Sequence, residues 1–428
     1  MTRDIRTVAL CALTMAFAPP TPALAQNTDT AVAPPFDLVT IHPGEPSWIA
    51  GVRLRAAEAR YRGTSWWGTY AQLRSQAEAR LGNNDGALRF WDQADGGTWP
   101  AVFIPPRLRA VPALALLTSI ADTARVIMIN ERHHAASDRL LTLKLLPVLW
   151  GKGFRYLALE TLSNTDSGLA RRGYALEQAT GYYTDDPVFG EVVRQALRLG
   201  YRIVPYECEP SQEDSLDGLN PQQRRDSIEA LNLYGRIFRA DPHAKVLVHA
   251  GYSHVKKSVT KTWSPMAAYF RKLSSIDPVT VDQTSLSEHS APEYERPVYR
   301  EAIAVGLLRT VPIVLMDSAG RSYMPDFPGV DFEVLTPRTT YDHGRPDWMR
   351  LGGLRVPTDV PTPECVMRVC VAEARLATEP DSAVALDRAE ASYVPRVRLF
   401  LPRGQQVRVR VADSAGTVID TSRARAAR

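Results

Sequence analysis

The chain has 428 residues, of which 45% are hydrophobic and 23% are charged, and its formal net charge at pH 7 is +4. This length suffices for one large domain or for roughly two or three smaller ones. The charge is nearly balanced and no dense block of lysine and arginine stands out, which argues against nucleic acid as a partner.

The first 25 residues have the layout of a cleavable signal peptide. A short basic start precedes an apolar run from Val8 to Ala18, and the segment ends in the small-x-small pattern Ala23-Leu24-Ala25 that signal peptidase accepts. The apolar run is too short to span a bilayer as a helix, and no later segment is apolar for long enough. We therefore expect a periplasmic or secreted protein that does not span the membrane. The sequence does not reveal its oligomeric state.

Residues 26–48 are rich in Pro, Thr and Ala, and this composition predicts a disordered lead-in. Apolar and alanine residues then recur at helical spacing and predict helices over 49–61 and 66–81, followed by a break at 82–86. We interpret 49–110 as a helical N-terminal segment whose helices pack on one another.

From about residue 111, short apolar runs alternate with longer amphipathic ones. The short runs predict strands at 125–129, 154–159, 201–206, 244–249 and 278–282. The longer runs predict helices at 139–150, 186–199, 221–240 and 263–273. This order predicts an α/β domain over 111–340, with a largely parallel central sheet flanked by helices. The segments 302–308 and 311–316 are candidates for further strands at the edge of that sheet.

Residues 341–428 are richer in Pro, Gly and Arg, and they contain the strand candidates 397–401 and 407–411. The second alternates apolar and charged residues, which is typical of a half-exposed antiparallel strand. These features predict a small β-rich extension. Within it, Cys365 and Cys370 are close enough to close a small disulfide loop in an oxidising compartment, and we expect Cys208 to be a buried, inert thiol.

Side chains that can carry chemistry follow four of the predicted strands. They are Glu131, Arg132, His133 and His134 after the first, Glu160 after the second, Glu207 after the third, and His249 to His254 at the fourth. In a parallel sheet the carboxyl ends of the strands meet at one edge, where open α/β folds build their sites. We therefore expect these carboxylates and imidazoles to converge in one pocket.

Histidine and glutamate together support two routes to hydrolysis. They can ligate a divalent metal and lower the pKa of its bound water, or a histidine held by a carboxylate can act as a general base on water. Neighbouring residues of an extended segment point to opposite sides, so only one of His133 and His134 is expected to face the pocket.

The sequence over about 120–285 resembles the erythromycin esterase-like, ChaN-like and TIKI/TraB superfamily. The resemblance is carried by Asn130-Glu131-Arg132-His133-His134, by Gly153 to Glu160, and by Gly251-Tyr252-Ser253-His254. Members have a Gly-Glu-x-His or Gly-x-x-His motif after the first strand, a Glu after the second, and another Gly-x-x-His near the last core strand. Asn130 stands where the family usually has Gly, a position that we expect to need an unusual backbone conformation, which Asn tolerates.

The resemblance leaves the register of the first motif open. Counting as in Gly-x-x-His selects His133, whereas counting Glu-x-x-His, as in the erythromycin esterases, selects His134; we favour His133 slightly. The implied activities also differ. Erythromycin esterase-like members hydrolyse a macrolide lactone without a required metal, TIKI-like members are metal-dependent proteases, and ChaN-like members bind haem.

These observations predict an exported hydrolase that acts on an ester, lactone or peptide bond of a small-molecule or peptide substrate. The expected catalytic residues are Glu131, His133, His134, Glu160 and His254. If a divalent ion such as Mn, Zn or Fe is bound, its expected ligands are Glu131, His133, Glu160, His249 and His254. The expected substrate contacts are Arg132, Tyr206, Glu207 and Tyr252. Arg139 and Arg172 are expected to be surface arginines, and 174–183 is expected to form either a lid or pocket wall or a packed loop.

Two alternatives remain from the same residues. The protein could be a non-catalytic envelope protein that binds haem or metal, with Tyr206, Tyr252 or a histidine as ligand. It could also be a member that has kept the fold and lost the activity.

Overall fold

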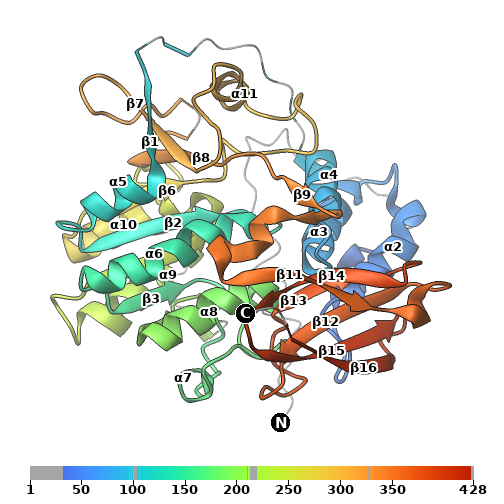
Figure 1. The fold of residues 1–428 in the computed structure, drawn as a ribbon. Coiled ribbons are helices and arrows are strands. Elements are labelled where there is room, and N and C mark those ends of the chain that lie inside the picture. Colours follow the sequence, from blue (N-terminus) through green and yellow to red (C-terminus); the bar gives the residue numbers. More distant parts are fainter. Residues whose placement is uncertain are drawn as a thin grey trace.

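The computed structural model describes residues 32–95, 97, 99, 104, 105, 107–209, 211, 212, 219–325 and 327–425. A central sheet of eight strands has helices on both faces, and smaller antiparallel sheets follow toward the C-terminus (Figure 1). The expected signal peptide lies outside the described residues. Within them, no helix has the length and apolar character needed to cross a membrane.

The strand order of the central sheet is β1-β7-β8-β6-β2-β5-β3-β4. Its strands are β1 (Arg109–Pro112), β2 (Val126–Glu131), β3 (Tyr156–Leu159), β4 (Arg202–Pro205), β5 (Val246–Gly251), β6 (Val279–Asp282), β7 (Ile313–Met316) and β8 (Phe332–Leu335). The strands from β8 to β4 are parallel, while β7 and β1 are antiparallel additions at one edge. The predicted α/β class with a largely parallel sheet is therefore confirmed.

Four helices around the sheet lie close to their expected positions: α6 (Arg139–Gly151), α8 (Pro187–Leu199), α9 (Pro221–Leu233) and α10 (Met266–Ser274). Two more, α5 (Ala113–Ile120) and α11 (Pro297–Ala304), were not predicted. Helix α8 starts where the Asp186 carboxylate accepts from the backbone N–H of Val188 at 2.9 Å, and it ends at Gly200 with φ 95°. Helix α9 continues into a π-helical turn, Tyr234–Phe238.

One predicted edge strand is wrong. The segment 302–308 lies in the end of α11 and in the turn after it. Pro297 occupies the first turn of this helix, where its missing N–H costs nothing, and Gly306 follows with φ 74°. These signals of a helix start and stop outweigh the apolar content of the segment. The other candidate, 311–316, contains β7.

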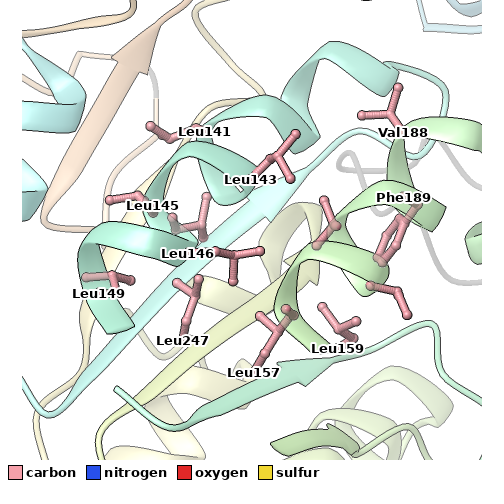
Figure 2. Close-up of a cluster of buried hydrophobic side chains, with 14 of the residues drawn as sticks. Leu141, Leu143, Leu145, Leu146, Leu149, Leu157, Leu159, Val188, Phe189 and Leu247 are labelled. Carbon is pink, nitrogen blue, oxygen red and sulfur yellow. The ribbon is translucent and has the colours of Figure 1, made fainter. Parts of the chain in front are cut away.

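Each strand of the sheet centre divides its side chains between two hydrophobic cores. In β2, Ile127 and Ile129 pack under α5, α6 and α8, whereas Val126 and Met128 pack under α9 and α10. Figure 2 shows the first of these cores, in which leucines of α6 meet Leu157 and Leu159 of β3 and Phe189 of α8. Burial on both faces explains why these strands are continuous apolar runs in the sequence.

The N-terminal segment forms α2 (Ile49–Tyr61), α3 (Trp67–Arg80) and α4 (Asn84–Asp95), close to the predicted helices. The expected disorder of 26–48 does not hold for its described part. A 3₁₀ turn, Pro35–Val39, has Phe36 and Leu38 packed against the core of these helices. Apolar side chains in this proline-rich stretch therefore gain enough burial to be ordered.

The C-terminal residues form antiparallel sheets that lie beside the N-terminal helices (Figure 1). Their strands are β9 (Tyr341–Asp342), β10 (Arg345–Pro346), β11 (Arg355–Pro361), β12 (Cys370–Leu376), β13 (Asp387–Glu390), β14 (Arg396–Pro402), β15 (Gln406–Asp413) and β16 (Val418–Arg425). Cys365 and Cys370 form a disulfide, and Cys208 is half-buried rather than buried.

Candidate active site

The pairing of the central strands brings the predicted site residues to one edge of the sheet. Parallel register places Glu131 beside Gly251 across β2 and β5, and Leu159 beside His249 across β5 and β3. Glu160 follows Leu159 directly, and its N–H donates to the His249 carbonyl at 3.2 Å. Three segments that are far apart in the sequence thus end side by side.

Glu131 is the centre of the first group of side chains, and it is 2% exposed. Arg139 Nε donates to Glu131 Oε2 at 2.6 Å, and its Nη2 donates to Oε1 at 3.1 Å. The two imidazoles bind opposite oxygens of the same carboxylate: His133 Nδ1 lies 3.0 Å from Oε1 and His249 Nε2 lies 3.1 Å from Oε2. Although burial alone would raise the pKa of Glu131, Arg139 and the two imidazoles hold it well below its usual range. Glu131 is therefore an anion.

An anionic carboxylate accepts hydrogen bonds only, and this fixes the tautomers of both histidines when they are neutral. His249 carries its proton on Nε2, so its Nδ1 accepts from the Thr142 hydroxyl at 2.9 Å. His133 carries its proton on Nδ1, so its Nε2 keeps a free lone pair. A Cβ atom on Gly251 would lie 2.7 Å from that Nε2, so glycine is needed where the strand passes the imidazole.

Tyr183 covers one face of the His133 ring, with the ring centroids 3.7 Å apart and the planes 11° from parallel. Tyr183 begins a 3₁₀ turn, Tyr183–Asp185, which leads into α8. The segment 174–183, expected to be either a lid or wall or a packed loop, therefore ends directly on a predicted site residue. His133 is 8% exposed under this cover.

Glu160 belongs to a second group, in which Arg225 of α9 is the main partner. Arg225 Nη2 donates to Glu160 Oε1 at 2.5 Å and to Glu207 Oε2 at 2.7 Å. The Gly251 N–H donates to Glu160 Oε2. Burial opposes ionisation, but His254, Arg225 and His133 together lower the pKa of Glu160 to about 2. Glu160 is therefore an anion as well.

His254 lies between three carboxylates. Its Nδ1 is 2.7 Å from Asp226 Oδ1 and 3.1 Å from Glu229 Oε2, and its Nε2 is 3.7 Å from Glu160 Oε1. Burial disfavours the imidazolium, but the surrounding Glu229, Asp226 and Glu160 raise the pKa of His254 well above its usual value. His254 is therefore a buried cation next to Glu160.

Glu229 has no exposed surface, and burial raises its pKa to about 8. Its Oε1 lies 2.9 Å from Arg225 Nε and its Oε2 lies 3.1 Å from His254 Nδ1. Neither approach has the alignment of a hydrogen bond, so neither oxygen has a hydrogen-bond partner among the residues that the structure describes. Among the described residues, Glu160, Glu229 and His254 form the one group of three possible metal ligands whose donor atoms lie within 4.8 Å of one another.

The structure does not bring the whole predicted ligand set together. Glu160 and His254 belong to the group just described, whereas Glu131, His133 and His249 do not. The physical reason is that both oxygens of Glu131 are occupied. His133 and His249 each bind one of them, and Arg139 binds the carboxylate as well. The sequence missed Glu229, which lies on a helix and not after a strand.

His133 and His134 contact different parts of the protein, as expected, but they lie in a turn after β2 and not in the extended segment on which the expectation rested. His134 stacks on Trp91 with ring centroids 4.1 Å apart, and within the described part of the chain neither of its ring nitrogens has a hydrogen-bond partner. Burial lowers its pKa well below the usual value, so its ring is neutral. His134 therefore has no contact with the two carboxylate groups, and the catalytic role predicted for it is untested.

Asn130 does not occupy the unusual backbone position that the resemblance implied. It lies inside β2, and its side chain donates to Asp282 Oδ1 at 2.6 Å and to the Tyr252 carbonyl at 2.7 Å. The unusual conformation of this edge belongs to Tyr252, which has φ 38°. The Asn130 amide therefore holds the turn between Gly251 and His254 in place.

The four predicted substrate contacts are engaged within the protein. Arg132 binds the Asp138 carboxylate through Nε at 3.0 Å and Nη2 at 2.9 Å, and Glu207 binds Arg225. The Tyr206 hydroxyl donates to the His249 carbonyl at 3.0 Å, and Tyr252 meets His133 edge-on. Their contact with a substrate stays a prediction.

Sequence reasoning missed four charged residues of the site. They are Arg139 on α6 and Arg225, Asp226 and Glu229 on α9. Arg139, expected on the surface, is 1% exposed, because it binds Glu131 on one side and Asp186 on the other at 3.0 Å. The missed signal on α9 is a polar helix with Arg225 and Glu229 at i,i+4 spacing, where an apolar face would be expected against the sheet.

No protein-family model matches the chain, and no curated protein matches it in sequence. Among solved structures, that of ChaN of Campylobacter jejuni with cofacially bound haem aligns with 14% identity over 52% of this chain and 92% of that chain, at a TM-score of 0.34. RRSP, a MARTX toxin effector domain from Vibrio vulnificus, aligns with 12% identity over 56% of this chain and 52% of that chain, at a TM-score of 0.29. The type III effector HopBA1 aligns with 16% identity over 42% of this chain and 90% of that chain, at a TM-score of 0.28. Likenesses at these values do not bear on function, which has to be argued from the site itself.

Proposed function

We propose that the protein is a hydrolase in which His133, oriented by Glu131, takes a proton from the water that attacks an ester, lactone or peptide carbonyl. The observation that carries this proposal is the Glu131–His133 hydrogen bond of 3.0 Å. Arg139 also donates two hydrogen bonds to Glu131 and keeps it anionic. We further propose, from the N-terminal sequence, that the reaction takes place in the periplasm or outside the cell.

The proton movements follow from the fixed tautomer. His133 Nε2 receives the proton of the attacking water, and Glu131 stabilises the imidazolium through the Nδ1 proton. The same Nε2 proton is then delivered to the leaving oxygen or nitrogen. Arg139 does not touch the reacting atoms in this scheme and acts as a positioning residue for Glu131.

The second group supplies the positive charge that acyl transfer needs. A carbonyl oxygen becomes negative when water attacks it, and fixed positive groups stabilise this charge in a water-poor site. His254 and Arg225 are both buried cations that contact Glu160 Oε1, whereas Gly251 donates to the other oxygen, Oε2. In this proposal they stabilise the oxyanion, while Glu160 holds them in place.

Access to His133 requires movement of its cover. Tyr183 stacks on the ring, and its pKa is raised well above the usual value by burial, so the phenol is neutral. Displacement of the turn Tyr183–Asp185 would uncover His133 without breaking the bonds to Glu131. The turn then acts as the lid of the site.

A divalent metal fits one part of this arrangement. Glu160, Glu229 and His254 would hold it, and the Glu229 carboxylate, buried without a hydrogen bond, is the observation that favours a cation there. The bond of His254 Nδ1 to Asp226 resembles the carboxylate–histidine arrangement found behind metal ligands. A bound ion would polarise the carbonyl and lower the pKa of water. It would have to replace the proton on His254 Nε2 and compete with Arg225 for Glu160.

Haem does not fit the residues expected to bind it. The Tyr206 hydroxyl is directed into the core, where it donates to the His249 carbonyl, and Tyr206 has no exposed surface. His254 is enclosed by carboxylates on both nitrogens. We therefore derive no chemistry through haem.

Two adjacent histidines provide a matched test. The protein is assayed on a panel of esters, lactones and peptides together with His133→Phe and His134→Phe. Phenylalanine keeps the stacking on Tyr183 or on Trp91 in each case and removes only the nitrogens. We expect His133→Phe to lose at least about a hundredfold in kcat/KM and His134→Phe to stay within a few fold of the unmodified protein. Equal activity of the two variants, or no hydrolysis of any substrate by the unmodified protein, would contradict the proposal.

A further inference from the structure

A cavity of about 560 Å³ lies at the same edge of the sheet as the two carboxylate groups, on the other side of β2. The carboxylate groups occupy the ends of β2, β5 and β3, whereas the cavity is lined by Pro112 at the end of β1, Gln283 after β6 and Thr336 after β8. Helices α4, α5 and α6 and the turn that begins at Asp347 complete its walls. Its volume is in the range typical of sites for drug-sized molecules.

The two arginines that line this cavity are paired with carboxylates of the protein itself. Arg132 binds Asp138 through two nitrogens, and Arg338 binds Glu295 through Nε at 3.1 Å. The Glu288 carboxylate accepts from two uncharged donors, the N–H and the hydroxyl of Thr339, at 2.9 and 2.6 Å. The two arginines therefore have little attraction left for a charged ligand.

Two polar groups in the wall differ from the rest. Lys144, exposed on the outer side of α6, has no ion pair or hydrogen bond with any residue that the structure describes. The indole N–H of Trp348 is buried and has no acceptor within the described structure. Around them the wall is apolar, with Leu88, Leu114, Leu140 and Val311. A buried donor without a partner is rare in proteins because it forfeits its bond to water.

We propose that this cavity binds a small amphipathic anion, with an apolar body against the leucines and a carboxylate, sulfonate or phosphate held by Lys144. Among the described residues, Lys144 is the charged group of the wall without a partner, so the ligand must supply negative charge. The inference rests on the cavity alone and does not depend on hydrolysis at His133.

The test uses two probes that share an apolar body. One is 8-anilinonaphthalene-1-sulfonate, and the other is N-phenyl-1-naphthylamine, which lacks the sulfonate. The full-length protein is titrated with each probe, and dissociation constants are measured from probe fluorescence. We expect the sulfonate to bind more tightly than the neutral probe, and Lys144→Ala to weaken only the sulfonate, by about three- to tenfold.

A second variant shows where the probes bind. Ala115 is exposed on α5 and lines the cavity, so Ala115→Trp places a large ring in the space without disturbing the core. We expect this variant to lose at least about tenfold in affinity for both probes. Undiminished binding of both probes to Ala115→Trp would place them elsewhere and overturn the proposal. So would an equal effect of Lys144→Ala on the charged and the neutral probe.

Discussion

Replacement of Glu131 by glutamine tests the base assignment most directly. The carboxylate has four short contacts, two to Arg139 and one each to His133 and His249. Glutamine has the same size but offers one oxygen and one NH₂, so at least one of these donors meets another donor. If the NH₂ faces His133 Nδ1, the imidazole takes the other tautomer and places its proton on Nε2, where the base must be free.

The size of the expected effect follows from these contacts. A wrong tautomer of a catalytic histidine costs roughly 10³- to 10⁴-fold in turnover, so we expect Glu131→Gln to lose about this factor in kcat/KM. We expect Glu131→Gln to lower the free energy of unfolding by less than the roughly 3–5 kcal/mol that is lost when one partner of a buried ion pair is removed. Arg139 keeps Asp186 at 3.0 Å, so we expect a loss of about 2 kcal/mol in the free energy of unfolding, measured in urea.

The matched control is Glu191→Gln. Glu191 is also buried, on α8, and it binds Arg355 at 3.0 Å, but it contacts none of the candidate catalytic groups. We expect Glu191→Gln to lose about as much free energy of unfolding as Glu131→Gln and to keep its kcat/KM within a few fold of the unmodified protein. If folded Glu131→Gln retained more than about a tenth of the activity, orientation of His133 by Glu131 could not be the basis of catalysis.

Two further predictions concern the second carboxylate group. Because the pKa of Glu160 is lowered from 4.5 to about 2 in the folded state, its ionisation stabilises the fold above pH 4.5, and this contribution, up to about 3 kcal/mol, is lost as the pH falls toward 2. We expect the free energy of unfolding of Glu160→Gln to depend less on pH between about 2 and 4.5 than that of the unmodified protein. An unchanged slope would show that the pKa of Glu160 is not lowered in the folded state. For the metal, we expect added Zn²⁺ to bind with one-to-one stoichiometry in calorimetry and Glu229→Gln to weaken it at least about tenfold. Equal affinity in this variant would rule out Glu229 as a ligand.

The strand ends show what could be predicted from the sequence. Buried parallel strands are continuous apolar runs, and polar residues mark their ends, as Asn130-Glu131 and Glu160 show. Once the sheet class is known, parallel register alone brings those ends together. The divergence of His133 and His134 is expected from the alternation of an extended segment, but the two residues lie in a turn after β2.

The contribution of α9 could not be predicted in the same way. A polar helix is ordinarily a surface helix, and nothing local shows that Asp226 and Glu229 turn inward. Their burial depends on pairing with His254, which another part of the fold brings to them, and with Arg225 of the same helix. Likewise, Arg139 is identified as a site residue only once Glu131 and Asp186 are seen on its two sides.

The cost of this arrangement is itself an argument for function. Burying ionised side chains carries a desolvation penalty that their mutual attraction barely offsets, and apolar residues of similar volume would often be at least as stabilising. Here six carboxyl groups (Glu131, Asp186, Glu160, Glu207, Asp226 and Glu229) surround two arginines and an imidazolium at one edge of the sheet, and the pKa of Glu229 is displaced upward while that of Glu160 is displaced downward. Carboxyl groups with pKa values driven apart beside an imidazole oriented by a carboxylate are typical of sites that move protons. Stability alone would not require such a cluster, whereas water activation at His133 would.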